Sequence, residues 1–439
     1  MGEYVDIRIK KLSVRYFKNY LEDKVVELFF NQQDLVILEN VCEEPNDEDS
    51  TPYTKYMYKT SVKRAKERMD CMGYGLSNVE KIFEEKKYDA INYTDFLIHL
   101  HVSIEDFDEK AKERIREKVT FQKWKNSMKK IIGYELDNGN IYEEKNCETL
   151  DVTTECDKVI KYSLTALNSE SYYGINTDII NEAYVFRLIL ECCDEEEEVC
   201  LDFSDLDYYD EDCIPKAIEA AGNAEKTIVL VEGTSDKDIL EFAMRKIYPH
   251  LSDLFYFMDF DDGHGKKRDG GTSFIIKNLE TFYFSKLKAK FIALFDNDAT
   301  GYQSERKLFD MIQWPNNFRI MCYPEIKDFK KYPTLVPNGT IVPDDINKKA
   351  CSIELYLPDR IIKDDNNEYY PIEWESRIPI KEEDGVIVYK YQGVIMNKDE
   401  IKREFHKLRN AINNNEVVFD LSEWKRMKDL LDSFVFAFK

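Results

Sequence analysis

The pattern of hydrophobic and polar residues changes about halfway along the chain. In the first half, apolar residues gather in short stretches at residues 5–9, 25–30 and 35–38, which predicts strands. Helical spacing follows, with Thr60 or Ser61 as an N-cap and Gly133 as a stop signal. The helices expected in this half lie at residues 61–69, 78–85, 104–132 and 178–191. The first half is therefore predicted to be mixed and rich in helices.

The second half alternates almost wholly apolar runs with helical patterns. Strands are expected at residues 227–231, 254–258, 291–295 and 318–322. Helices are expected at residues 235–248, 272–287 and 300–312. Strands that alternate with helices indicate βαβ units and a mostly parallel sheet. Ligands of such sheets bind beyond the carboxyl ends of the strands, so the residues after each strand are the candidates for chemistry.

Carboxylates follow two of these strands. Glu232-Gly233 comes after the first strand, with Asp236 one helical turn further on, and Asp296-Asn297-Asp298 comes after the third. Parallel strands end at the same edge of a sheet, so these carboxylates are expected to converge. Such a cluster is costly to desolvate unless a cation lies among its members. Mg²⁺ prefers oxygen ligands and keeps waters for a phosphate substrate, so Mg²⁺ or Mn²⁺ is the expected cofactor.

The two motifs together resemble the Toprim fold of topoisomerases, primases and the nucleases of the overcoming-lysogenization-defect group. The family signature is a strand ending in Glu-Gly and a later strand ending in Asp-x-Asp, here Glu232-Gly233 and Asp296-Asn297-Asp298. The resemblance implies that Glu232 is a general acid/base or metal ligand and that Asp296 and Asp298 hold the metal. In the nuclease branch an acid four residues after the glutamate also lies at the metal, which matches Asp236.

The flanking regions resemble HEPN/Toprim-associated proteins, which are bacterial and linked to defence against phage. The matching segments lie at residues 60–74, 182–187, 201–206 and 350–357, and at Tyr391-Gln392-Gly393 with Lys398. The expected fold class is α/β. A HEPN/Toprim-associated N-terminal domain spans residues 1–215, and the acidic run at residues 194–198 together with residues 205–212 is expected to be the linker that closes it. A Rossmann-like Toprim catalytic domain with a mostly parallel sheet spans 222–335, and an α+β C-terminal extension at 336–439 completes it.

The N-terminal part lacks the ribonuclease motif of HEPN proteins, an arginine followed four to six residues later by histidine. His99 and His101 have no arginine at that distance before them. This part is therefore expected to be structural or to bind nucleic acid through its basic helices.

Two further features are candidates for the site. Lys266, Lys267 and Arg268 form a basic tip between two of the predicted strands and are candidates for nucleic-acid binding, with a solvated loop as the alternative. Glu354 lies in an apolar stretch and is a candidate ligand of a second metal, with a buried structural glutamate as the alternative.

Two other functions fit part of the pattern. The residues from Asp296 to Thr300 also fit the D-x-D-x-[TV] motif of haloacid dehalogenase-like phosphatases, with Asp296 as nucleophile and Asp298 as general acid/base. That motif normally lies on the first strand of its domain, whereas here a strand with Glu232 precedes it. A scaffold that binds metal or nucleic acid without catalysis is the second alternative.

The net charge and the composition of the chain restrict the partners and the cellular compartment that are expected for it. The chain has 439 residues and a formal net charge of −24, which argues against nonspecific coating of nucleic acid. Its ten cysteines include no Cys-x-x-Cys pair, so reduced, mostly buried thiols are expected. No apolar run approaches membrane-spanning length and no secretory signal is visible, so a cytoplasmic protein without membrane contact is expected.

These observations predict an Mg²⁺- or Mn²⁺-dependent nuclease that hydrolyses DNA or RNA phosphodiesters. The sequence contains no G-x-x-x-x-G-K-[ST] loop, so the fused ATPase of the overcoming-lysogenization-defect enzymes is not expected in this chain. Control is therefore expected from an activating partner protein, a homo-oligomeric state or another trigger.

Overall fold

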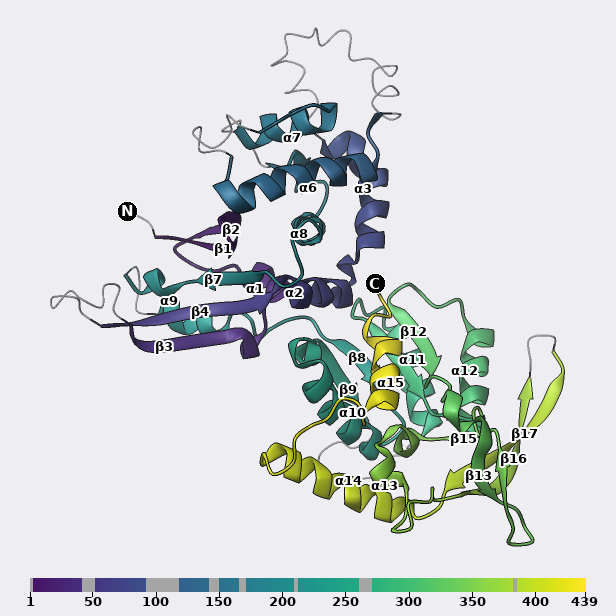
Figure 1. Cartoon of the computed structure of the whole chain (residues 1–439). Helices are drawn as coiled ribbons and strands as arrows, with labels where there is room; N and C mark the ends of the chain where they lie inside the picture. The colour runs from purple at the N-terminus through teal and green to yellow at the C-terminus, as the bar shows by residue number, and fades with distance from the viewer. Residues whose placement is uncertain are drawn as a thin grey trace. The chain divides into compact units, whose positions relative to one another are not determined.

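The computed structural model describes residues 3–41, 52–91, 118–141, 150–165, 171–208, 212–259, 271–381 and 385–439. The chain divides into two compact units, coloured from purple to teal and from teal to yellow in Figure 1. Unit 1 consists of Met1–Ala224 with Phe438–Lys439, and unit 2 consists of Glu225–Ala437.

Unit 1 is built on a five-stranded antiparallel sheet with the strand order β2-β1-β7-β4-β3. The strands are β1 (Tyr4–Ile9), β2 (Leu12–Lys18), β3 (Leu35–Val41), β4 (Tyr53–Ser61) and β7 (Glu198–Asp202), and β5 (Ser171–Tyr172) and β6 (Ile175–Asn176) form a separate small pair. The acidic run at residues 194–198 was expected to belong to a linker, but its last residue, Glu198, begins β7, the middle strand of the sheet. Val199 and Leu201 are fully buried there and hold the strand in the core.

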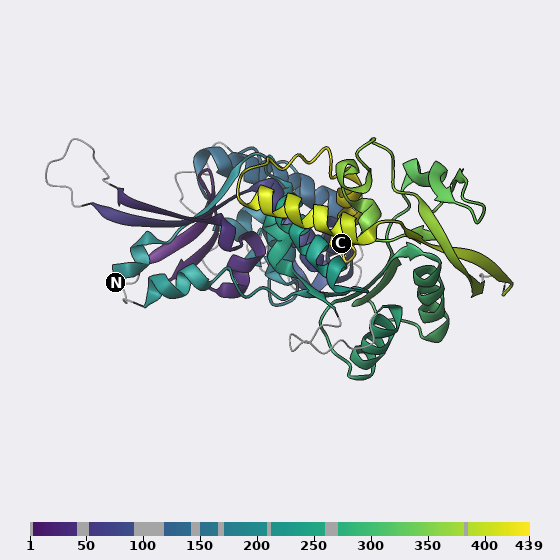
Figure 2. The ribbon, with the colours of Figure 1, turned by 90° about the horizontal axis from the view of Figure 1, so that it is seen from below.

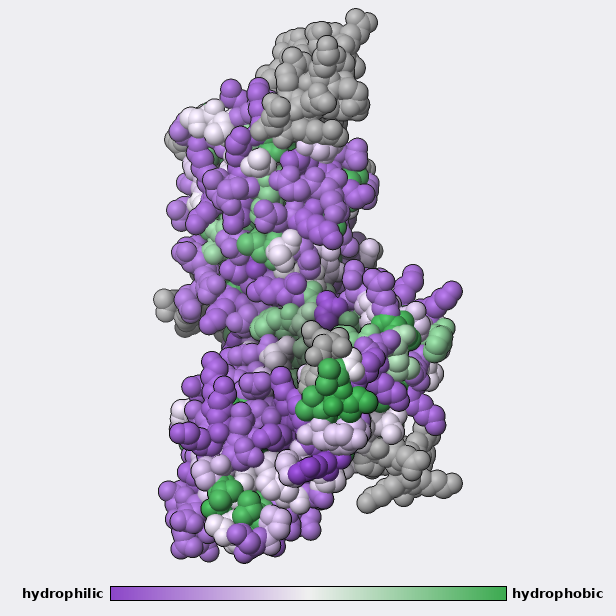
Figure 3. Space-filling view, turned by 90° about the vertical axis from the view of Figure 1, so that its right-hand side faces the viewer, coloured by the Kyte–Doolittle hydropathy of each residue, from purple (hydrophilic) through white to green (hydrophobic). Residues whose placement is uncertain are grey.

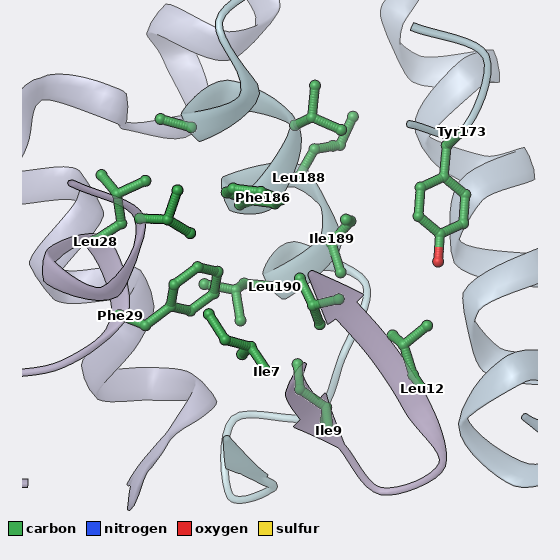
Figure 4. Close-up of a cluster of buried hydrophobic side chains, with 14 of the residues drawn as sticks. Ile7, Ile9, Leu12, Leu28, Phe29, Tyr173, Phe186, Leu188, Ile189 and Leu190 are labelled. Atoms are coloured by element: carbon green, nitrogen blue, oxygen red, sulfur yellow. The ribbon is translucent and has the colours of Figure 1, made fainter. Parts of the chain in front are cut away.

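Helices pack against this sheet and complete the core of unit 1. They are α1 (Asp23–Phe29), α2 (Val62–Met69), α3 (Leu76–Ala90), α6 (Phe121–Asn138), α7 (Glu155–Thr165), α8 (Glu182–Glu191) and α9 (Cys213–Glu219). Figure 4 shows Ile7 and Ile9 of β1 close to Leu190 of α8, with Phe29 of α1 beside Phe186. The Phe29 and Phe186 ring centroids are 5.5 Å apart.

Two expectations for unit 1 are wrong. Residues 25–30 were expected to be a strand, but residues 25–29 lie in helix α1 and Phe30 is its C-cap, since a short apolar run fits a buried helix as well as a strand. Gly133 was expected to end a helix, but α6 passes through it to Asn138. By contrast, the predicted N-cap is confirmed, because the Ser61 hydroxyl accepts a hydrogen bond from the Arg64 amide at 3.3 Å. Of the helix expected over residues 104–132, residues 104–117 lie outside the described residues, and residues 121–132 are confirmed as part of α6.

Unit 2 contains the parallel sheet that the sequence predicts. Its strand order is β12-β10-β8-β9, and each neighbouring pair is parallel. The strands are β8 (Thr227–Leu230), β9 (Phe255–Met258), β10 (Phe291–Phe295) and β12 (Phe318–Cys322), connected by α10 (Thr234–Ile247), α11 (Thr272–Phe284) and α12 (Ala299–Met311). Each of these strands and helices was expected within a few residues of its observed bounds.

Helices cover both faces of the parallel sheet (Figure 1). On one face, Phe291, Ala293 and Phe295 of β10 pack with apolar residues of α11 and α12. On the other face lie α10 and α15 (Lys425–Val435), and Phe434 of α15 stacks edge-on against Phe255 at 5.8 Å. Because β10 is buried on both faces, the residues that follow it at the carboxyl edge of the sheet are the ones that a ligand can reach.

The rest of unit 2 contains a second four-stranded sheet with the strand order β14-β13-β16-β17. Its strands are β13 (Tyr332–Leu335), β14 (Ile341–Asp344), β16 (Ile372–Lys381) and β17 (Ile387–Ile395). A separate short pair is formed by β11 (Asn297–Asp298) and β15 (Ala350–Cys351). Helix α13 (Asp359–Ile362) follows β15, and helix α14 (Lys398–Asn413) follows β17. The β16–β17 hairpin extends away from the parallel sheet in both ribbon views (Figures 1 and 2).

The mostly hydrophilic face in Figure 3 and the free cysteine thiols are consistent with the amino-acid composition. Figure 3 shows one face of the molecule, mostly hydrophilic with small hydrophobic patches, and Ile387 and Val388 of the hairpin are among the exposed apolar side chains. No helix in the described part of the chain is both long and apolar enough to cross a membrane. The eight cysteines within the described ranges are free thiols, as expected.

Gly133 provides a test of how the exposed side of α6 is packed. A Cβ atom added there meets no heavy atom within 4 Å. Gly133→Ala is therefore expected to raise the free energy of unfolding by about 0.5–1 kcal/mol, because alanine loses less backbone entropy in a helix than glycine. Denaturant titration of the full chain measures this change, and a loss of stability would show that the helix interior is not open at this position.

Candidate carboxylate site

Glu232 and Asp296 meet at the carboxyl edge of the parallel sheet. Glu232 follows β8 and Asp296 follows β10, and these two strands are direct neighbours. The Asp296 backbone amide donates a hydrogen bond to Glu232 Oε1 at 3.1 Å. The sequence predicted this convergence, and the structure places the two residues together.

Asp298 is held by groups from two distant parts of the chain. Its Oδ1 accepts a hydrogen bond from the Gly301 amide at 2.7 Å, which makes it the N-cap of α12. Its Oδ2 accepts a hydrogen bond from Gln392 Nε2 at 2.7 Å, and Gln392 Oε1 in turn accepts one from the Thr300 amide at 3.1 Å. Asp298 is therefore oriented by both the helix start and strand β17.

Gly301 allows α12 to begin directly against the strand end. A Cβ atom at this position would lie 2.2 Å from the carbonyl oxygen of Asp296, closer than such atoms approach in folded proteins. Glycine is therefore required for the tight step from strand to helix that brings Asp296 and Asp298 onto one side.

Asp236 and Glu354 join the cluster from other elements. Asp236 lies in the first turn of α10, and its Oδ1 accepts a hydrogen bond from the Tyr323 hydroxyl at 3.4 Å. Glu354 is fully buried in a 3-10 turn, Ile353–Tyr356, and its Oε2 accepts a hydrogen bond from the Ser352 hydroxyl at 2.8 Å. The charge of Glu354 raises the pKa of Asp236, which indicates that the two carboxylates are close.

Burial and mutual repulsion make these acids weak. Burial, followed by the charges of Asp298 and Asp236, raises the pKa of Glu232 to about 8. Burial and the charge of Glu354 raise the pKa of Asp236 to about 7. The pKa of Asp296 is raised well above its ordinary value by burial and by the charges of Glu232, Asp236 and Asp298. Asp296 Oδ1 is buried without a hydrogen-bond partner.

Lys398, the first residue of α14, brings a positive charge to the cluster. Its Nζ lies 3.2 Å from Glu354 Oε1. Burial lowers the pKa of Lys398, but the charges of Glu354 and Asp296 outweigh this effect, so the pKa is raised and the group stays protonated. Sequence analysis assigned no role to Lys398 or Gln392 beyond their place in a matching segment, because each lies about a hundred residues after the Asp-x-Asp motif.

Asn297 ties the edge of the site to a loop further along the chain. Its Oδ1 accepts a hydrogen bond from the Lys348 amide at 2.8 Å, and its Nδ2 donates to Asn347 Oδ1 at 3.2 Å. The middle residue of Asp-x-Asp therefore positions the segment before β15.

A pocket of about 360 Å³ flanks the carboxylates between the start of α10 and α14. Its lining includes Ser235 and Lys237 from α10 and Lys402 and His406 from α14. Lys402 lies 4.0 Å from Glu354, which connects the pocket to the cluster.

The basic tip and the metal site were both predicted from the sequence. Lys266, Lys267 and Arg268 lie outside the described residues. Within the described ranges, no group of three or more His, Cys, Asp and Glu side chains is placed to hold a metal ion.

Comparison with known families defines the class of protein. Residues 1–220, half of the chain, match the family described as HEPN/Toprim N-terminal domain 1. The chain therefore belongs to the HEPN/Toprim N-terminal domain 1 family and is a HEPN/Toprim-associated protein. This membership suggests a nuclease-related role. No curated protein and no solved structure gave a match.

The close contact at Gly301 leads to a testable expectation. Gly301→Ala is expected to lower the free energy of unfolding by about 2 kcal/mol or more, because the new Cβ overlaps a backbone oxygen that cannot rotate away. Denaturant titration measures the loss, with Gly133→Ala as the matched control for the same substitution in an open helix. An unchanged stability for Gly301→Ala would contradict the tight step between β10 and α12.

Proposed function

We propose that unit 2 contains a Toprim catalytic domain and that the protein is a nuclease that hydrolyses phosphodiesters with the help of Mg²⁺ or Mn²⁺. The observation that carries this proposal is the convergence of Glu232, Asp296 and Asp298 at the carboxyl ends of two adjacent parallel strands. Family membership supports it independently, through residues outside this unit.

The chemistry of the carboxylates suits a hard divalent cation. They offer oxygen donors, their raised pKa values reflect mutual repulsion, and Asp296 Oδ1 is buried without a partner. The described side chains are not grouped as a metal site in the structure, so a cation would have to draw Glu232, Asp296 and Asp298 together, with Asp236 beside them. It would then relieve both costs. When bound, it would polarise the phosphate and activate a water molecule.

The chain's own groups have separate tasks in this proposal. Glu232, with a pKa of about 8, is suited to exchange a proton near neutral pH. Gln392 and the Gly301 amide keep Asp298 oriented. Lys398 reduces the negative charge that repels an incoming phosphate. Glu354 forms an ion pair with Lys398 and is also the candidate ligand of a second metal.

The phosphatase alternative explains fewer contacts. It assigns roles to Asp296 and Asp298 but none to Glu232, which bonds the Asp296 amide, or to Asp236. We therefore favour the nuclease, and from the family resemblance we propose that it acts in bacterial defence against phage, under the control of a partner protein or of oligomeric state.

Cleavage assays test the proposal directly. The purified chain is incubated with supercoiled plasmid, single-stranded DNA and tRNA in Mg²⁺, Mn²⁺ or EDTA. Cleavage of at least one substrate is expected with metal and not with EDTA. Glu232→Gln and Asp298→Asn are each expected to lower the rate by about 10²-fold or more, because both keep the shape of the side chain but remove its charge.

Asp310→Asn is the matched control, since Asp310 lies near the other end of α12 in an exposed ion pair with Lys381. This variant is expected to cleave at the rate of the unaltered chain. Cleavage that survives both site substitutions would place the chemistry elsewhere, and an acid-labile phosphoprotein formed on Asp296 would favour the phosphatase.

Metal binding is expected to depend on pH. Because the pKa values of Glu232 and Asp236 are raised in the folded chain, the folded state binds more protons than the unfolded state between about pH 4.5 and pH 8. Without metal, stability is therefore expected to fall as pH rises through this window. A divalent cation replaces those protons, so Mn²⁺ or Mg²⁺ should raise Tm more at pH 8.5 than at pH 5.5.

Thermal melting with and without metal measures this difference. The double variant Asp296→Asn with Asp298→Asn should lose the metal-dependent shift at both pH values. An equal shift in that variant would mean that the metal binds elsewhere.

A further inference from the structure

Two lysines and a tyrosine lie near Asp298 of the carboxylate site. Tyr302 is one helical turn beyond Asp298 in α12, and its ring centroid is 4.3 Å from Lys390 Nζ and 5.2 Å from Lys348 Nζ. Cations at these distances from an aromatic ring are attracted by its electron-rich face. The three side chains therefore form a compact group, here called the Tyr302 cluster.

The backbone fixes this cluster beside the carboxylates. The Lys348 amide donates a hydrogen bond to Asn297 Oδ1, inside the Asp-x-Asp segment. Lys390 lies two residues before Gln392 on β17, so the two side chains share one face of the strand, and Gln392 bonds Asp298. Both lysines are thus held next to Asp298 by elements that already define the site.

The charge of the chain explains why such a cluster would be needed. A net charge of −24 and a buried group of acids both repel a polyanion. A nucleic-acid strand can approach this edge only where local cations contact its phosphates. Lys348 also lies 3.4 Å from Glu325, but both side chains of that pair are partly exposed, so the contact is readily exchanged for a phosphate.

We propose that the Tyr302 cluster binds the phosphate backbone of the nucleic-acid substrate on one side of the scissile bond. Lys348 and Lys390 contact successive phosphates, and the Tyr302 ring keeps the two ammonium groups together. This proposal rests on the proposed nuclease function, but it concerns binding and not bond cleavage.

Binding of a fluorescein-labelled single-stranded DNA oligonucleotide to the full chain tests the proposal. Fluorescence anisotropy is measured in EDTA, where no cleavage occurs, over a series of salt concentrations. Lys348→Ala and Lys390→Ala are each expected to weaken binding by about five- to tenfold at low salt. Each should also reduce the slope of log Kd against log salt by roughly 0.7, the value for one phosphate contact of a single strand.

Two further variants distinguish the contribution of the Tyr302 cluster to DNA binding from a general effect of positive charge. Tyr302→Leu should weaken binding without changing the salt slope, because it removes the ring but no charge. Arg377→Ala is the matched control, because Arg377 is another cation beside a tyrosine, 4.5 Å from the Tyr391 ring centroid. Arg377 pairs with Tyr391 across the hairpin, and Tyr391 follows Lys390 directly, so this pair lies on the opposite face of the hairpin from Lys390. Its affinity should equal that of the unaltered chain.

Two results would overturn the proposal. One is an absence of binding by the unaltered chain, and the other is a double variant, Lys348→Ala with Lys390→Ala, that binds as tightly as the control. Thermal melting of each variant, expected to match the unaltered chain, excludes unfolding as the cause of a loss. Since binding is measured without metal, lysine-dependent binding in a chain that cleaves no substrate would count against the proposed nuclease and leave the phosphate contact standing.

Discussion

Burial of several carboxylates at one edge of the parallel sheet is the constraint on which the rest of unit 2 depends. Asp236 is buried, Glu232 and Asp296 are partly buried, and their raised pKa values indicate that ionising them together is unfavourable. A fold retains such groups only if other parts of the chain compensate for their charge. Lys398 and the hydrogen bonds to Asp298 provide this compensation.

The compensating groups explain why the C-terminal half of unit 2 belongs to the site. Lys398 begins α14, and Gln392 lies on β17, the last strand of the second sheet. Asn297 fixes the segment before β15. The parallel sheet alone would leave Asp298 with only its helix cap, so the second sheet and α14 complete the electrostatics of an edge that the first sheet creates.

The sequence predicted the parts of this arrangement that depend on local pattern. The strand before Glu232 and the strand before Asp296 are almost wholly apolar, and parallel pairing then forces their ends together. Lys398 and Gln392 could not be found in this way, since no periodicity relates residues about a hundred positions apart. The error at residues 25–30 has a different cause, because a run of six mostly apolar residues carries no period that separates a strand from a helix.

The raised pKa values also bear on how the proposed nuclease would be held inactive. Near neutral pH, acids with pKa values of about 7 and 8 remain partly protonated, and protonated acids are poor metal ligands. A cation of the proposed kind would therefore have to displace protons before it binds, so its affinity would depend on how strongly the surroundings favour the neutral acids. Any event that moves Lys398 or Gln392 changes that balance. On the proposed function, a partner that contacts α14 or the β16–β17 hairpin would alter metal affinity without touching a metal ligand.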